Sequence, residues 1–185
     1  RRADRALCRL LPSLPLARPL ARELRDRNID FELRIAGDGP LRTTLEGQIA
    51  THRLHEQVRL LGTLDFRLQL LPMLRHEIDL FVCPHLQGDP SCTYLETLCA
   101  GVPIVGYANE AWRGLQQLSS AGRVCALGRP EALASEIEAL SSDHEALKAL
   151  ATRALKFSIQ HVFDAEFERR IVHLQQLCEA AEHGA

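Results

Sequence analysis

The sequence has 185 residues, of which 46% are hydrophobic, and its 22 basic and 24 acidic side chains leave a net charge of −2. A chain of this length can bury a sizeable core on its own. The balanced charge excludes a global field that would draw the chain to nucleic acid or to anionic lipid, and an aromatic content of 5% is too low for base-stacking platforms. We therefore expect one soluble domain with no nucleic-acid partner and at most peripheral membrane contact.

The six cysteines and the lack of a membrane segment indicate in which cellular compartment the protein is expected. No Cys-x-x-Cys pair occurs, and five of the six cysteines lie in apolar stretches, so we interpret them as reduced, buried thiols of a cytoplasmic protein. No stretch approaches the about 18 apolar residues of a membrane span, and prolines interrupt the N-terminal region where a signal-peptide core would lie. The chain has no initiating methionine, as expected of a fragment or an excised domain.

Hydrophobic periodicity predicts strands and helices that alternate along the chain. A helix ends over residues 20–27, a strand spans 31–36, and a helix started by Pro40 spans 41–52. The elements that follow are a strand at 58–61, a helix at 68–76, a buried strand at 78–82, a helix at 91–100, a strand at 102–106, a helix at 111–119, an edge strand at 124–127 and an amphipathic helix at 130–140. Two charged helices complete the chain, at 144–157 and 164–182. The apolar stripe of the last helix is formed by Phe163, Phe167, Ile171 and Leu174.

This alternation predicts an α/β fold, with a mostly parallel, Rossmann-like sheet covered by helices on both faces and ligands bound outside the carboxyl ends of the strands. We divide the chain into a partial N-terminal strand and helix (1–28), a Rossmann-like binding domain (29–142) and C-terminal helices (143–185) that pack on the domain or on a missing partner domain. Asp89 and the turn formed by Gly37, Asp38 and Gly39 both follow strand ends. Both are therefore expected on the ligand-binding rim.

The start of the helix at 91–100 has the features of an anion site. Asp89 is a preferred N-cap residue, and Pro90 suits the first helical position because its missing N–H would have no intrahelical partner there. The backbone N–H groups of Ser91, Cys92 and Thr93 then point out of the helix start. The helix dipole adds partial positive charge there, which favours a phosphate or a diphosphate.

Glu96 lies seven residues after Asp89, on nearly the same helix face and about 10 Å along the axis. A ligand with phosphates at the helix start and vicinal hydroxyls further along would meet both the N–H groups and this carboxylate, as a nucleotide does with its diphosphate and ribose. The alternative is a solvated helix residue, but the neighbours of Glu96 one turn away are small and mostly apolar, which favours the ligand interpretation.

Other candidates have ordinary structural explanations beside the functional ones. The turn containing Gly37 and Gly39 could approach a nucleotide, or could be a strand-to-helix turn in which Asp38 or Gly39 caps the helix. His85 could bind a sugar or phosphate, or be a loop residue near water. His52 and His55 fit a surface helix end better than a metal site, since no third ligand is evident. The remaining rim candidates are Asn109, Glu110 and Trp112, whose alternative is a helix start packed by the tryptophan.

Residues 29–140 resemble the C-terminal, donor-binding half of a retaining GT-B glycosyltransferase (glycosyltransferases group 1, family four). The resemblance depends on the order and spacing of five segments together, and no single segment is specific by itself. The matching segments are FELRIAGDGPLR at 31–42, VRLLG at 58–62, DLFVCP at 79–84, YLETLCAGVPIV at 94–105 and RPEALA at 129–134.

The resemblance implies that Glu96 is the second glutamate of the family's Glu-(seven residues)-Glu motif, which holds the donor ribose, and that the backbone at Ser91, Cys92 and Thr93 faces the diphosphate. It also implies retaining transfer from a nucleotide-diphosphate sugar to an acceptor glycan, lipid or small molecule, with no metal and no separate cofactor. Part of the donor pocket and the acceptor site would come from a missing N-terminal GT-B half.

The sequence departs from the family pattern at two places. Gly88 occupies the position of the first glutamate, with Gln87 and Asp89 as neighbours that could substitute for it. Arg9 partly matches the family's phosphate-binding arginine, but the lysine expected after it falls in the segment 13–16, which reads SLPL. Loss of that cation would weaken the stabilisation of a departing diphosphate.

From these features we expect the donor-binding domain of a glycosyltransferase in glycan or polysaccharide biosynthesis, inactive as an isolated domain. One alternative is a non-catalytic nucleotide-sugar-binding or partner subunit, which the two departures favour. Another is a different Rossmann-like enzyme, such as a sugar-nucleotide epimerase, because fold alone does not fix chemistry.

Overall fold

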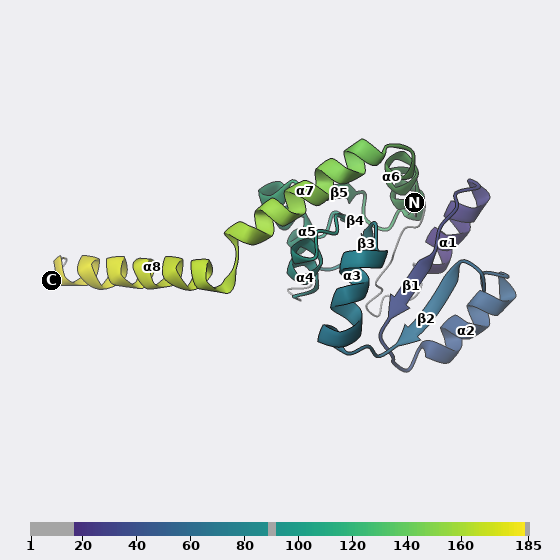
Figure 1. Ribbon diagram of the computed structural model, residues 1–185, viewed down its shortest axis with the longest axis horizontal. Coiled ribbons are helices and arrows are strands. Elements are labelled where there is room, and N and C mark those ends of the chain that lie inside the picture. The colour runs from purple at the N-terminus through teal and green to yellow at the C-terminus, as the bar shows by residue number, and fades with distance from the viewer. Residues whose placement is uncertain (1–16, 89–91, 184–185) are drawn as a thin grey trace.

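The computed structural model describes residues 17–88 and 92–183, which form an α/β fold (Figure 1). The strands are β1 (Leu33–Ala36), β2 (Val58–Gly62), β3 (Phe81–Cys83), β4 (Ile104–Tyr107) and β5 (Gly122–Cys125). The helices are α1 (Ala17–Asp26), α2 (Arg42–Thr51), the π-helical turn η2 (Phe66–Leu70), α3 (Leu71–Glu77), α4 (Thr93–Cys99), α5 (Glu110–Ser119), α6 (Pro130–Ser142), α7 (His144–Gln160) and α8 (Phe163–His183).

All the paired strands run parallel, as predicted, and they form two hydrogen-bonded groups in the described part of the chain. β1 pairs with β2, while β4 lies between β3 and β5. The expected single sheet is therefore divided, because β1 and β3 are not hydrogen-bonded to each other within the described ranges. Side chains nevertheless join the two groups, since Leu33 of β1 and Val82 of β3 belong to one hydrophobic cluster.

The alternation of side chains along β3 and β4 explains why helices cover both faces. Val82 and Val105 point into the cluster that α1 and α6 complete, while Phe81 and Ile104 point to the opposite cluster, with α3, α4 and α5. The α1–α6 contact also has polar links, because Arg27 donates hydrogen bonds to Ser135 and Glu138 at 2.9 Å each. Both faces of the three-stranded sheet are therefore buried, which places binding surfaces at the strand ends.

The helix predicted at 68–76 begins earlier and in a different geometry. Asp65 caps it, with its carboxylate accepting from the Leu68 N–H at 2.6 Å, and residues 66–70 form a π-helical turn before α3. Pro72 lies at the start of α3 and has no N–H to donate to the preceding turn. Its ring would also crowd the carbonyl four residues earlier in an α-helix, and the wider π turn accommodates it.

The two C-terminal helices differ in their relation to the domain. α7 packs on it through Leu150, Ala154 and Phe157, all of which are buried. α8 projects away from the body of the molecule (Figure 1), and its apolar stripe is exposed, with Phe163 at 75% and Leu174 at 60%. The stripe predicted from the sequence therefore exists, but it does not bury itself on this domain.

The prediction that the cysteines are buried is wrong for three of them. Cys83 and Cys125 are buried, whereas Cys92, Cys99 and Cys178 are exposed, and all five are free thiols. Cys92 and Cys99 are exposed because α4 buries only one face. The large side chains of Tyr94 and Leu98 occupy the buried positions, and the cysteines lie on the other side of the helix.

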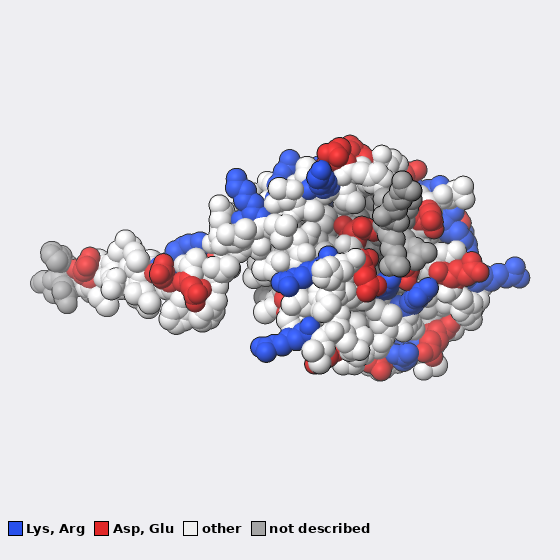
Figure 2. Space-filling model, in the orientation of Figure 1, with Lys and Arg blue, Asp and Glu red and all other residues white. Residues whose placement is uncertain are grey.

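Two further observations concern the surface. Acidic and basic side chains are interspersed on the face shown in Figure 2, in keeping with the balanced composition. In the described ranges, none of the helices combines the length and the apolar character needed to cross a bilayer.

Candidate functional site

The loop that follows β3 and the helix that follows β4 meet at one edge of the sheet. Gly88 lies against the beginning of α5, where a Cβ built on it would be 3.4 Å from the Ala111 backbone nitrogen, an ordinary contact distance. The carboxamide of Asn109 caps α5 by accepting from the Trp112 N–H at 2.8 Å, and it donates to the carbonyl of His85 at 3.1 Å. The segment 84–88, which leads to α4, is therefore fixed to the start of α5.

Glu96 lies in the first turn of α4 and is half-buried. Its helical neighbours Cys92 and Cys99 are exposed, and Leu95 beside it is 47% exposed. The other two neighbours one turn away, Thr93 and Ala100, are buried and half-buried, so Glu96 lies at the boundary between the buried and the exposed face of α4.

The remaining residues predicted at the helix start are only partly placed. The described helix begins at Thr93, which is buried, and Cys92 before it has helical dihedrals and provides no side-chain cap. Gly88 is exposed at the end of the preceding loop. The predicted cap Asp89 lies outside the described residues, as do Ser91, Arg9 and the segment 13–16.

A buried polar cluster lies beneath this helix start, centred on the hydroxyl of Tyr94. The Tyr94 oxygen is 3.0 Å from Cys83 Sγ, 3.4 Å from His85 Nδ1 and 3.5 Å from Asn109 Nδ2. Tyr94 and Asn109 are each 3% exposed and His85 is 8% exposed. His85 is therefore a member of a buried cluster rather than a loop residue near water.

The sequence interpretation missed Tyr94, although a signal was present. A tyrosine on the buried face of a helix must find a partner for its hydroxyl. For Asn109 and Trp112 the structural alternative is correct: Asn109 is the N-cap of α5 and Trp112 is fully buried, while Glu110 is exposed.

The turn with Gly37 and Gly39 follows β1 in the other strand pair. Gly37 has φ of +127°, which a residue with a side chain rarely adopts, and its N–H donates to the Gly62 carbonyl at 2.7 Å. Asp38 accepts from its neighbour's N–H and forms an ion pair with Arg42, so it does not cap α2. Both glycines are exposed.

Two acid–base groups, Tyr107 and Cys125, lie at the ends of β4 and β5. Burial raises the pKa of Tyr107, at the end of β4, to about 12, and the pKa of Cys125, at the end of β5, also to about 12. Both are therefore protonated near pH 7. No cluster of three His, Cys, Asp or Glu side chains in the described ranges is arranged to hold a metal ion.

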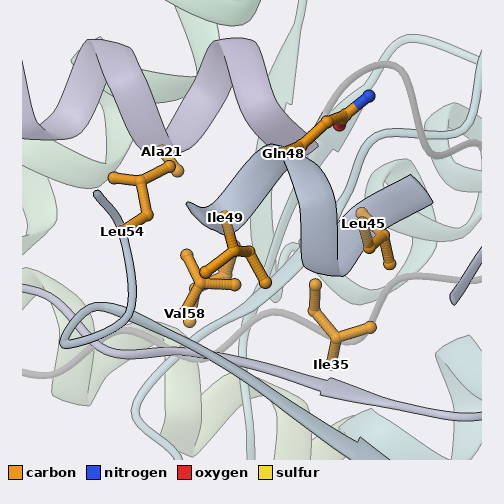
Figure 3. A pocket seen from close by; sticks show the side chains of 8 residues that line it. Ala21, Ile35, Leu45, Gln48, Ile49, Leu54 and Val58 are labelled. Carbon is orange, nitrogen blue, oxygen red and sulfur yellow. The ribbon is translucent and has the colours of Figure 1, made fainter. Parts of the chain in front are cut away.

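A small cavity lies away from this edge, between α1, β1 and α2 (Figure 3). Its volume is about 20 Å³, and its walls are aliphatic apart from Gln48. A space of that size holds about one water and offers it few partners, so the cavity is a packing gap rather than a ligand site.

The chain is similar in fold to solved glycosyltransferase structures of the GT-B type. HepE of Anabaena, crystallised with UDP and glucose, superposes with a TM-score of 0.76 at 18% identity, over 95% of this chain and 48% of that chain. TarM of S. aureus superposes with a TM-score of 0.78 at 15% identity, over 94% of this chain and 36% of that chain. This chain therefore spans about half or less of these proteins.

Sequence comparison points to the same group of enzymes. A 2-deoxystreptamine N-acetyl-D-glucosaminyltransferase of Niallia circulans is 31% identical over 90 residues, which are 49% of this chain and 23% of that protein. The model of the family described as glycosyl transferases group 1 matches residues 16–157, more than half of the chain. The chain belongs to the glycosyl transferases group 1 family.

Proposed function

We propose that this chain binds a nucleotide-diphosphate sugar and presents it for retaining transfer of the sugar to an acceptor. The observation that carries the proposal is the position of Glu96, half-buried in the first turn of α4, the helix that follows β3. Parallel sheets bind ligands outside the carboxyl ends of their strands. Membership of the glycosyl transferases group 1 family supports a sugar donor as that ligand.

In this proposal each part of the site has one role. The Glu96 carboxylate accepts hydrogen bonds from the two ribose hydroxyls, and charge-assisted bonds of this kind are the stronger ones. The backbone at Cys92 and Thr93, with Ser91 before them, faces the diphosphate, and Gly88 faces the sugar. As the bond from the anomeric carbon to the diphosphate oxygen breaks, the acceptor hydroxyl attacks from the same face, and donors at the helix start stabilise the charge of the departing diphosphate.

The proposal extends to the setting of the reaction. The acceptor, a glycan, a lipid or a small molecule, would be held by an N-terminal GT-B half, and the product would belong to glycan or polysaccharide biosynthesis. HepE was crystallised with UDP and glucose, which makes UDP the first nucleotide to test. The free thiols among the described residues support a reducing, cytoplasmic setting.

A non-catalytic nucleotide-sugar-binding subunit is the second candidate. It is favoured by Gly88 at the first glutamate position and by the absence of a lysine in the segment 13–16. Both candidates require nucleotide binding, whereas only the first requires transfer.

The test is calorimetric titration of the chain with UDP, ADP and GDP, followed by a transfer assay with the corresponding labelled sugars. Binding of at least one nucleoside diphosphate is the expected result. Failure of all three to bind at millimolar concentration would contradict both candidates, and binding without transfer in the complete enzyme would favour the second.

A further inference from the structure

We propose that Tyr94 is a positioning residue for the donor site: its buried hydroxyl fixes the first turn of α4 to the ends of β3 and β4, and thereby fixes the direction of the Glu96 carboxylate. The inference rests on the proposed function, because it concerns the same site. Tyr94 does not touch the donor, since it is 3% exposed.

The hydroxyl of Tyr94 contacts two segments of the chain outside α4, one at the end of β3 and one at the start of α5. Its contact with Cys83 Sγ, at 3.0 Å, reaches the last residue of β3, and its contact with His85 Nδ1, at 3.4 Å, reaches the loop before α4. The third contact, 3.5 Å from Asn109 Nδ2, reaches the cap of α5. One oxygen atom thus links α4 to the ends of two neighbouring strands.

The aromatic ring of Tyr94 is held as well as its hydroxyl. Its centroid lies 6.0 Å from the ring of Trp112 in a tilted arrangement. Trp112 is fixed in turn, because its indole N–H donates to the carbonyl of Arg123 on β5 at 3.0 Å and its backbone N–H donates to Asn109 at 2.8 Å. The tyrosine therefore has little freedom to change its rotamer. The helix turn that carries it is held in place for the same reason.

The short length of α4 makes this anchor necessary. The helix has seven residues, and the residue before it provides no side-chain cap. A helix of this length is not stable by itself and takes its direction from tertiary contacts. Glu96 follows Tyr94 by two residues in the same turn, so any loosening at Tyr94 moves the carboxylate relative to a bound ribose, and binding depends on that alignment.

The test compares Tyr94→Phe with Tyr107→Phe. Both changes remove one hydroxyl from a buried tyrosine and keep the ring. They differ in that the Tyr107 hydroxyl, also fully buried, has no hydrogen-bond partner within the described residues. The two variants are therefore matched in chemistry and burial, and only one of them breaks the anchor.

Two measurements are made on the wild type and the two variants, at a temperature below the unfolding transition of all three. In the ligand-free state, we expect amide hydrogen exchange in α4 to become faster by about tenfold in Tyr94→Phe, as expected when the contacts of one buried hydroxyl are lost, and to stay unchanged in Tyr107→Phe. In titration with UDP, ADP and GDP, we expect the dissociation constant of the nucleotide that binds to rise by about five- to tenfold in Tyr94→Phe only.

The outcomes separate this inference from the proposed function. A wild-type chain that binds none of the three nucleotides would overturn the proposed function and, with it, the role of Tyr94 in donor binding. Unchanged affinity in a Tyr94→Phe variant that is fully folded, beside a wild type that binds, would overturn the positioning role alone. Unchanged exchange in α4 would show that the hydroxyl does not anchor the helix. A merely structural tyrosine would lower the unfolding temperature without changing the affinity of the folded protein.

Discussion

Trp112 lies directly on the backbone of Gly106, so closely that a Cβ built at residue 106 would be 2.9 Å from the indole Cδ1. Because the same Cβ would also lie 3.0 Å from Cys83 Cβ, a side chain has no free direction there. Glycine on β4 is thus what allows the tryptophan of α5 to cover the end of the sheet beside the Tyr94 cluster.

We expect Gly106→Ala to destabilise the fold by about 1–3 kcal/mol, because the added methyl group overpacks a closed site. Denaturant unfolding measures the change. The control is Gly114→Ala in the middle of α5, where nothing lies within 4 Å of an added Cβ. Alanine there should stabilise the protein by about 0.5–1 kcal/mol through helix propensity. Equal stabilities for the two variants would contradict the close contact with Trp112.

Glu96→Gln should weaken nucleoside-diphosphate binding by about 1.5–3 kcal/mol, or about one to two decades in affinity, because charge-assisted hydrogen bonds to the ribose become neutral ones. Calorimetric titration with the nucleotide that the wild type binds measures the loss. Glu145→Gln, on the exposed first turn of α7, serves as the control and should leave the affinity unchanged. If Glu96→Gln also leaves it unchanged, the solvated-helix interpretation of Glu96 is the correct one.

Gly88→Glu tests the departure from the family's glutamate pair. The backbone at residue 88 requires no positive φ, and an added Cβ makes only ordinary contacts with α5, so the variant should fold. We expect it to bind the nucleotide sugar more tightly than the wild type does, by about tenfold, because a carboxylate can then accept from sugar hydroxyls. Titration with the nucleotide and with its sugar derivative isolates the sugar contribution. Gly88→Ala is the control, and a gain in the alanine variant would refute the carboxylate explanation.

Deletion of residues 163–185 should leave the unfolding temperature of the remaining domain nearly unchanged. No side chain of α8 in the range 163–180 is buried, whereas α7 carries the buried residues that close the core. Differential scanning calorimetry of the full chain and of the truncated chain measures the difference. The matched control is Phe157→Ala on α7, where loss of a buried ring should cost about 3–5 kcal/mol. A large loss on truncation would mean that α8 packs on the domain in solution.

The parallel strands could be predicted because apolar strands alternate with helices along the chain. Helices that connect parallel strands cover both faces of the sheet, so the strands between them are continuous apolar runs. The helix start packed by Trp112 was likewise one of two alternatives, and the structure adds that Asn109 is its N-cap. The burial of His85 was not readable, since it depends on Tyr94 and Asn109, which lie 9 and 24 residues away in the sequence. The exposure of Cys92 and Cys99 was also hidden, because an apolar small residue fits either face of a short helix.

Neither the π turn before α3 nor the division of the strands into two groups could be predicted from hydrophobic periodicity. Periodicity gives the kind of an element, but not how Pro72 alters the preceding turn or whether β1 reaches a neighbour. For the candidate site, the sequence predicted Glu96 and the helix start before it, which stay predictions. It did not predict what fixes them, because a hydrogen-bond network between strand ends has no sequence period.

The 185 residues alone should bind nucleotide weakly and transfer no sugar. In the proposed reaction, the acceptor and part of the donor pocket come from an N-terminal half, and the rate depends on holding both reactants in line between the two halves. With one wall absent, a bound donor would face water. Transfer from labelled UDP-, ADP- and GDP-sugars should be measured with this chain alone and with an N-terminal GT-B half supplied in trans. The Glu96→Gln variant provides the background rate in both series. Robust transfer by this chain alone would mean that an acceptor site is built within it, for example along α8, and the two-half account of the reaction would be wrong.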